Sequence, residues 1–152
     1  MWHKEMDGKI LLILSGENSL NAEKAAFNYA KQTSKSMVIL QILTSFLYQY
    51  GHHDMIATRP SKRQFLLHIR DEVLRRGQEE AEALKERAHR EGISIEIFSI
   101  ETEDVSQAAI SEAQKGYDVI FLTKEKRKRF PLLEKTLAQH LEKRVDIPII
   151  PC

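Results

Sequence analysis

The feature that most constrains this chain is a regular alternation of short apolar runs with longer segments of helical periodicity. Runs rich in isoleucine, leucine and valine predict strands buried on both faces. They occupy residues 9–15, 37–43, 93–100, 118–122 and 147–150. Helical spacing connects them, and it spans residues 22–33, 63–91 and 105–113, with a last helix from Pro131 that carries Leu133, Leu137 and Leu141. Strands that alternate with helices predict an α/β fold, with a parallel sheet between two helical layers and right-handed crossovers.

The length of 152 residues fits one domain, so we expect residues 1–152 to fold around a single core. Residues 1–8 are expected to be an N-terminal extension, and residues 44–62 a long connection in which the periodicity fades. The 23 basic and 22 acidic residues give a formal net charge of +1, which provides no overall attraction to nucleic acid or membranes. Any electrostatic function must therefore be local.

Cysteine content and hydropathy bear on the compartment. Cys152 is the only cysteine, so the fold does not depend on a disulfide within the chain. The polar N-terminus does not resemble a signal peptide, and the longest apolar run, residues 10–14, is far too short to span a bilayer. We expect a cytoplasmic protein that does not associate with membranes.

The chain order points to a ligand site at one edge of the sheet. In open α/β sheets, ligands bind beyond the carboxyl ends of the strands, where the strand order reverses. The loops after the first and fourth strands, residues 15–19 and 123–130, are therefore the first candidates. The second loop contains the segment KEKRKR at residues 124–129, which could bind an anion through side chains or could be a solvated surface loop.

Several segments, taken in order, resemble the universal stress protein family. They are KILLILSG at residues 9–16, AFNYA at 26–30, GYDVIFL at 116–122 and DIPII at 146–150, and the resemblance covers residues 8–151. It implies a three-layer α/β/α sandwich of the adenine nucleotide alpha hydrolase-like type, with a five-stranded parallel sheet in the order 3-2-1-4-5. It also implies a homodimer formed through the last strand.

The sequence departs from the family where many members bind ATP. Ser15 stands in place of the usual aspartate, followed by the expected Gly16, while Thr123 and Lys126 occupy the first two glycine positions of the phosphate loop. Thr136 matches the final hydroxyl only if one residue is deleted. Glycine lets backbone N–H groups turn toward a phosphate, whereas a β-branched or long side chain occupies that space. The resemblance therefore predicts a protein that is not a standard ATP binder.

Three functions remain open at this point. The leading hypothesis is a non-catalytic binding or regulatory module that uses no cofactor and acts through a protein partner or an anionic small molecule. The alternative is a divergent binder of ATP or another adenine nucleotide, with or without slow ATP hydrolysis. Its predicted site residues are Ser15, Gly16, Ile42, Thr123, Lys124, Lys126, Arg127 and Thr136. The third is a weak nucleic-acid or polyanion binder, which is disfavoured because only Phe130 offers an aromatic platform near the basic segment.

No catalytic or metal-ligating residue is predicted. Ser15 follows a strand but lacks the Gly-x-Ser-x-Gly context of a nucleophile elbow. His52, His53 and Asp54 are adjacent in the long connection, yet no fourth ligand is evident and chance clustering in a polar loop explains them.

Overall fold

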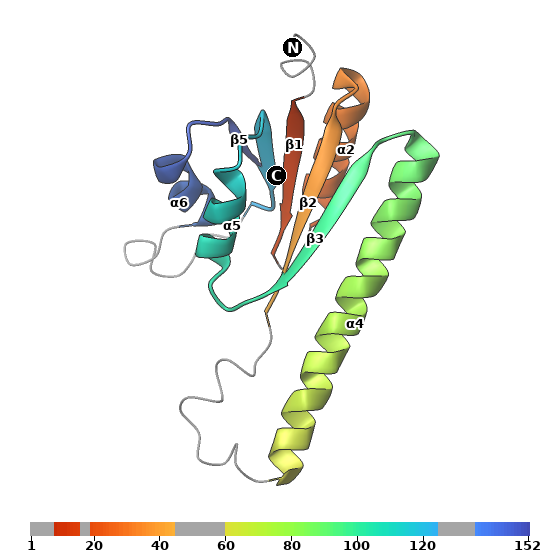
Figure 1. Cartoon of the computed structure of the whole chain (residues 1–152), viewed down its shortest axis with the longest axis vertical. Helices are drawn as coiled ribbons and strands as arrows, with labels where there is room; N and C mark the ends of the chain where they lie inside the picture. Colours follow the sequence, from red (N-terminus) through yellow and green to blue (C-terminus); the bar gives the residue numbers. More distant parts are fainter. Residues whose placement is uncertain (1–7, 16–18, 45–59, 125–135) are drawn as a thin grey trace.

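The computed structural model describes residues 8–15, 19–44, 60–124 and 136–152, and within them strands alternate with helices as the sequence predicts (Figure 1). The elements are β1 (Lys9–Leu14), α2 (Leu20–Thr33), β2 (Ser36–Leu43), α4 (Pro60–Glu91), β3 (Ile95–Glu101), α5 (Val105–Ala113), β4 (Val119–Leu122), α6 (Leu137–Arg144) and β5 (Ile149–Pro151). Among the helices of these ranges, none is long and apolar enough to cross a membrane.

All five strands form one parallel sheet in the order β3-β2-β1-β4-β5. β1 lies in the centre, where Leu11 pairs with Val38 on one side and with Ile120 on the other. Residues 10–13 of β1 have no exposed surface, which agrees with an apolar run buried on both faces. The predicted fold class and strand order are confirmed.

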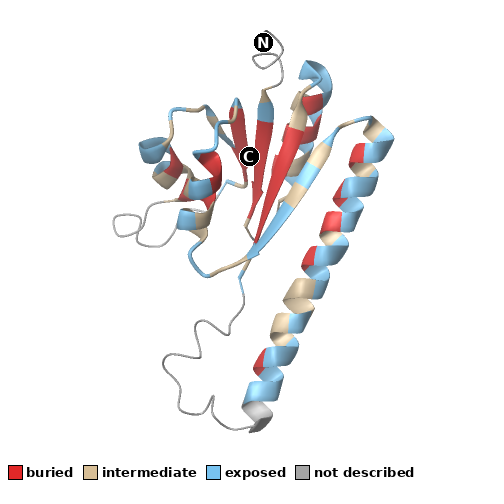
Figure 2. Ribbon diagram, in the orientation of Figure 1, coloured by how far each residue is buried: buried red, intermediate tan, exposed pale blue. Residues whose placement is uncertain are grey.

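Two core clusters lie on opposite faces of the sheet, between the sheet and the helices, so the structure has three layers. One face packs against α2 and α4, for example through Ala26 and Leu84, and the other against α5 and α6, through Ala109 and Leu141. Alternate residues of each central strand enter opposite clusters, as the two-residue period of a strand requires. Burial is therefore greatest in β1, β2 and β4, which Figure 2 shows almost wholly buried.

Element boundaries differ by a few residues from those read off the sequence. α4 begins at Pro60, three residues before the predicted start, so only residues 45–59 of the predicted connection lie outside the described ranges. β3 begins at Ile95 rather than at residue 93, because Gly92 adopts a positive φ of 71° and ends α4. Ile93 N–H then bonds to Ala88 O at 2.9 Å, the hydrogen bond of a Schellman cap. β5 is likewise shifted, to Ile149–Pro151.

Gly77 allows α4 to lie close to the end of β2. A Cβ atom at this position would be 2.9 Å from the Leu43 side chain, so helix and strand approach more closely than a larger residue permits. The Gln41 side chain, only 2% exposed, crosses the contact: its Nε2 donates to the Gly77 carbonyl at 2.9 Å, and its Oε1 accepts from Ser99 Oγ at 2.7 Å. α4 continues through Gly77 as one helix.

We expect Gln41→Ala to lower the free energy of unfolding by about 1–2 kcal/mol, because buried hydrogen-bonding groups lose their partner. Urea unfolding followed by circular dichroism measures the loss. Gln78→Ala, on the exposed side of α4, is the matched control and should change stability little. Equal midpoints for the two variants would contradict this role of Gln41.

Candidate functional site

The carboxyl edge of the sheet brings together the described members of the predicted site. Ser15 follows β1, Thr123 and Lys124 follow β4, and the registers Leu14↔Gln41 and Ile13↔Leu122 carry these positions to the same edge. Ser15 and Thr123 are half-buried, and Lys124 is exposed. Gly16, Lys126 and Arg127 lie outside the described residues, as does most of the basic segment 124–129.

Ile42 lies at this edge but faces the core. Its side chain is only 3% exposed and belongs to the cluster that packs against α5 and α6. A base placed near Ile42 could therefore contact only its main chain. This position differs from Ser15 and Lys124, whose side chains reach solvent.

The main chain after β4 is engaged by the end of the chain. Lys124 N–H donates to Cys152 O at 3.1 Å, and Cys152 N–H donates to Leu122 O at 2.9 Å, which extends the pairing between β4 and β5. A backbone cradle for phosphate needs N–H groups that point outward from this turn. The N–H group of Lys124 does not, since it already has an acceptor.

Thr136 is the N-cap of α6 and forms a reciprocal capping box with Gln139. The Thr136 hydroxyl accepts from Gln139 N–H at 3.2 Å, and Thr136 N–H donates to the Gln139 side-chain oxygen at 2.9 Å. The first free donors of a helix are what an anion would otherwise bind. At α6 the Gln139 carboxamide occupies one of them.

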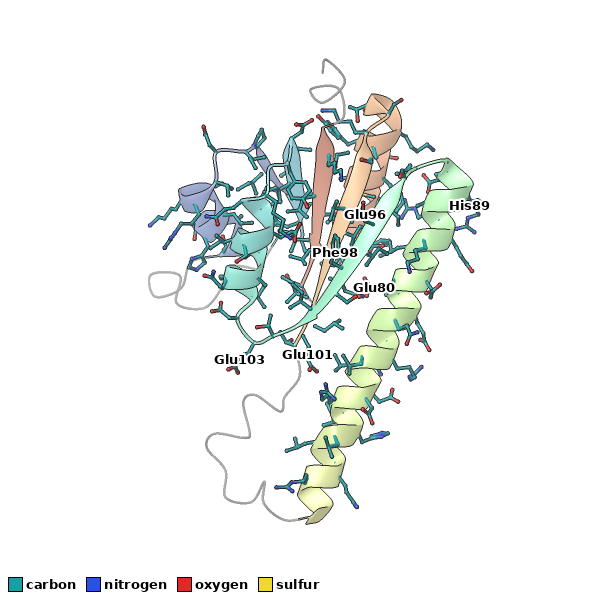
Figure 3. The ribbon with its side chains drawn as sticks, in the orientation of Figure 1. Glu80, His89, Glu96, Phe98, Glu101 and Glu103 are labelled. Carbon is teal, nitrogen blue, oxygen red and sulfur yellow. The ribbon has the colours of Figure 1, made fainter. Side chains whose placement is uncertain are left out.

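Sequence reasoning missed a polar cavity between the end of β2 and α4. The cavity has a volume of about 290 Å³ and is lined by Leu14, Gln41, Ile42, Leu43, Thr44, Val73, Arg76, Gly77 and Glu80. Glu80 extends from α4 toward the sheet in Figure 3. The available signal was Gln41, a polar residue inside the apolar run MVILQIL, but a single amide in a strand does not by itself predict a cavity.

Burial controls the charge state of Glu80. Loss of solvent raises the pKa of its carboxyl group, and the nearby Glu23 carboxylate raises it further, while a hydrogen bond from Gln41 acts in the opposite direction. Glu23 itself accepts a hydrogen bond from Ser19 Oγ at 2.5 Å. The Ser19 hydroxyl therefore bonds to Glu23 and does not cap α2, although Ser19 occupies the N-cap position.

The described side chains of this edge provide groups that could hold a ligand. In the described ranges, no three histidine, cysteine, aspartate or glutamate side chains are placed to hold a metal ion. His52, His53 and Asp54 lie outside those ranges. What the edge offers is hydrogen-bonding side chains, one exposed lysine and a half-buried carboxyl group, which can orient a ligand.

Comparison with known proteins identifies the fold. No protein-family model matches the sequence, and no curated protein matches it. Solved structures do match over nearly the whole chain. A universal stress protein family structure from Burkholderia pseudomallei is 20% identical with a TM-score of 0.66, covering 97% of this chain and 96% of that one. The universal stress protein UspA from Lactobacillus plantarum is 13% identical with a TM-score of 0.64, covering 95% and 97%.

A third similar structure contains a nucleotide. It is a universal stress protein family protein from Arabidopsis thaliana with AMP bound, 12% identical with a TM-score of 0.54, and the match covers 95% of this chain and 90% of that one. At such identities the likeness is one of fold. This chain therefore has the universal stress protein fold, and the resemblance read from the sequence is confirmed at that level.

We expect Glu80→Gln to raise the free energy of unfolding at pH 7. Because the folded-state pKa of Glu80 is raised, the ionised carboxylate is less favourable in the folded than in the unfolded chain. The gain should disappear as the pH falls below the ordinary glutamate value of 4.5, where both states are protonated. Urea unfolding across this pH range tests it, with Glu86→Gln on the exposed side of α4 as control. A gain that does not depend on pH would contradict the assignment.

Proposed function

We propose that the protein is a non-catalytic binding module of the universal stress protein fold that does not bind ATP in the pose a glycine cradle permits. Its ligand or partner is recognised at the carboxyl edge of the sheet, through side chains rather than bare main chain. The proposal concerns what the edge can bind, and it assigns no bond-breaking step to any residue.

The observation that carries the proposal is the occupation of N–H groups where phosphate would bind. Lys124 N–H is bonded to Cys152 O, and Thr136 N–H to the Gln139 side chain. Binding a triphosphate there would require breaking these bonds, each of which contributes about 1 kcal/mol to stability. The threonine at position 123 adds a β-branched side chain where glycine would leave the main chain accessible.

Calorimetric titration with ATP and magnesium tests this directly. We expect no magnesium-dependent binding in the micromolar range. The double variant Thr123→Gly/Lys126→Gly, which restores the two glycines, should gain ATP affinity because the main chain becomes accessible. Tight, magnesium-dependent ATP binding by the unmodified protein would refute the proposal.

A nucleoside monophosphate is the second candidate ligand. It is favoured by the Arabidopsis thaliana structure of the same fold with AMP bound, because a single phosphate needs fewer backbone donors than a triphosphate. Lys124, which is exposed at the carboxyl edge, together with Lys126 and Arg127 would supply charge to that phosphate. Ile42 would offer only its main chain to the base.

Charge reversal tests whether a nucleoside monophosphate binds at this edge through Lys126 and Arg127. If AMP binds at this edge, Lys126→Glu/Arg127→Glu should weaken it at least tenfold in the same calorimetric assay. The control is Lys85→Glu/Arg90→Glu, which changes the same charge on the exposed side of α4. AMP affinity that survives the first pair of substitutions would place its site elsewhere.

We further propose that two copies pair through β5. This strand is an edge of the sheet, and its Ile150 keeps 38% of its surface exposed. Pairing across β5 would bury Ile150 and satisfy the free main-chain groups of the edge.

Sedimentation velocity measures the oligomeric state. We expect a dimer for the unmodified protein and a monomer for Ile150→Asp, because an aspartate in the contact would be desolvated without a partner. Leu20→Asp, on an exposed leucine of α2, should leave the dimer intact. A dimer that persists in Ile150→Asp would show that another surface forms it.

A further inference from the structure

Within the part of the chain that the structure describes, no helix covers one face of β3. Ile95 and Ile97 pack into the core cluster that contains α2 and α4 residues, whereas the alternate residues Glu96, Phe98 and Ile100 point to the opposite face and are exposed. Phe98 is 45% exposed and Ile100 37%. Figure 2 shows the contrast between β3 and the buried strand β2 beside it.

The bare face arises from the lengths of the helices. α2 and α4, of 14 and 32 residues, cover one side of the sheet, while α5 and α6 have only 9 and 8 residues. α5 packs mainly on α6, and the outermost strand that it packs against is β2. In the described ranges, the helical layer on this side of the sheet therefore stops before β3.

A groove runs between β3 and α5. Its volume is about 340 Å³, and one wall contains Ala108 and Ser111, which lie three residues apart on α5. Small side chains on one side of a helix allow another element to approach closely. We call the exposed residues Glu96, Phe98 and Ile100 of β3, with Ala108 and Ser111 of α5 and Lys115 of the turn after it, the β3–α5 surface.

The rim of the β3–α5 surface is acidic. Glu96, Glu103 and Asp104 are exposed around it, and Figure 3 shows Glu96 and Glu103 on either side of Phe98 along the chain. Of the basic groups, Lys9 lies 4.0 Å from Glu96, and Lys115 is bonded to Glu112 at 2.9 Å.

Lys115 shows how a cation is held on this surface. Its ammonium group lies over the Phe98 ring, 6.0 Å from the centroid. The same ammonium bonds to the carboxylate of Glu112, which is 6% exposed and also accepts from the Tyr117 hydroxyl. Aromatic and acidic groups together thus accommodate a positive charge.

We propose that the β3–α5 surface docks a basic amphipathic helix of a partner protein, which completes the helical layer over β3. Phe98 and Ile100 lie about 7 Å apart along the strand. Apolar side chains four residues apart on a helix are separated by about 6 Å, so two of them fit these two residues. Lysine or arginine side chains flanking them would face Glu96 and Glu103.

Charge selects this partner over a second copy of the chain. A two-fold contact of the β3–α5 surface with itself would bring the two acidic rims together, which is unfavourable. The surface contains none of the residues predicted for the carboxyl-edge site, so its test is independent of the proposed function.

The experiment uses a fluorescein-labelled synthetic helix of about 15 leucine, alanine and lysine residues, and a matched peptide with glutamate in place of lysine. Fluorescence anisotropy with the full chain should show that the lysine peptide binds at least tenfold more tightly than the glutamate peptide. Its affinity should fall as salt is added. Phe98→Asp/Ile100→Asp should weaken binding at least tenfold, while Leu20→Asp should not.

A second variant distinguishes loss of the docking surface from misfolding of the first variant. Glu96→Lys/Glu103→Lys keeps Phe98 and Ile100 and changes only exposed residues, and it should also weaken the lysine peptide at least tenfold. Absence of binding to the unmodified protein, or binding by either variant that is as tight as that of the unmodified protein, overturns the proposal. So does a change of oligomeric state in Glu96→Lys/Glu103→Lys, because the surface would then be a contact between copies.

Discussion

The constraint on which this structure depends is the handedness of crossovers in a parallel sheet. Strands are added from β1 outward to β2 and β3, and then on the other side to β4 and β5. Right-handed connections then place α2 and α4 on one face and α5 and α6 on the other. Helix length is the remaining variable, and most of the described helical residues lie on one side, in α2 and α4. The densely covered face carries the polar cavity at Glu80, and the sparsely covered face leaves Phe98 exposed.

The same constraint is the reason for proposing a ligand site at the carboxyl edge. The strand order reverses between β1 and β4, so the loops that follow these strands diverge and leave an opening between them. Of the main-chain donors that the structure describes, Lys124 N–H and Thr136 N–H are internally bonded. Proteins of one fold can differ in the groups that follow their strands, so fold alone does not assign the ligand.

Strands and helices were predictable because apolar periodicity is a local property. The run at residues 9–15 and the stripe along residues 63–91 each determine their own element, and the strand order followed from the family resemblance. The site was less accessible, since it depends on contacts between distant residues. Nothing local in the sequence places Gln41 against Gly77, 36 positions away, or pairs the last residue with Lys124. Thr136 illustrates the difficulty: it matches a phosphate motif and it also caps a helix, and both roles favour threonine at a helix start.

Because Gly77 has no Cβ atom, it also fixes the axial position of α4 on the sheet. If the helix slid by one turn, Val73 or Ala81 would come to the contact with Leu43, and either would bring a Cβ atom into space that only glycine leaves empty. Farther toward the start of α4, Arg70 bonds to the Glu101 carboxylate through two nitrogens, a second point of attachment. A rod of 32 residues held at these points has a single axial position. Its first turns, which Figure 1 shows extending past the strands, are therefore held at a fixed position along the sheet.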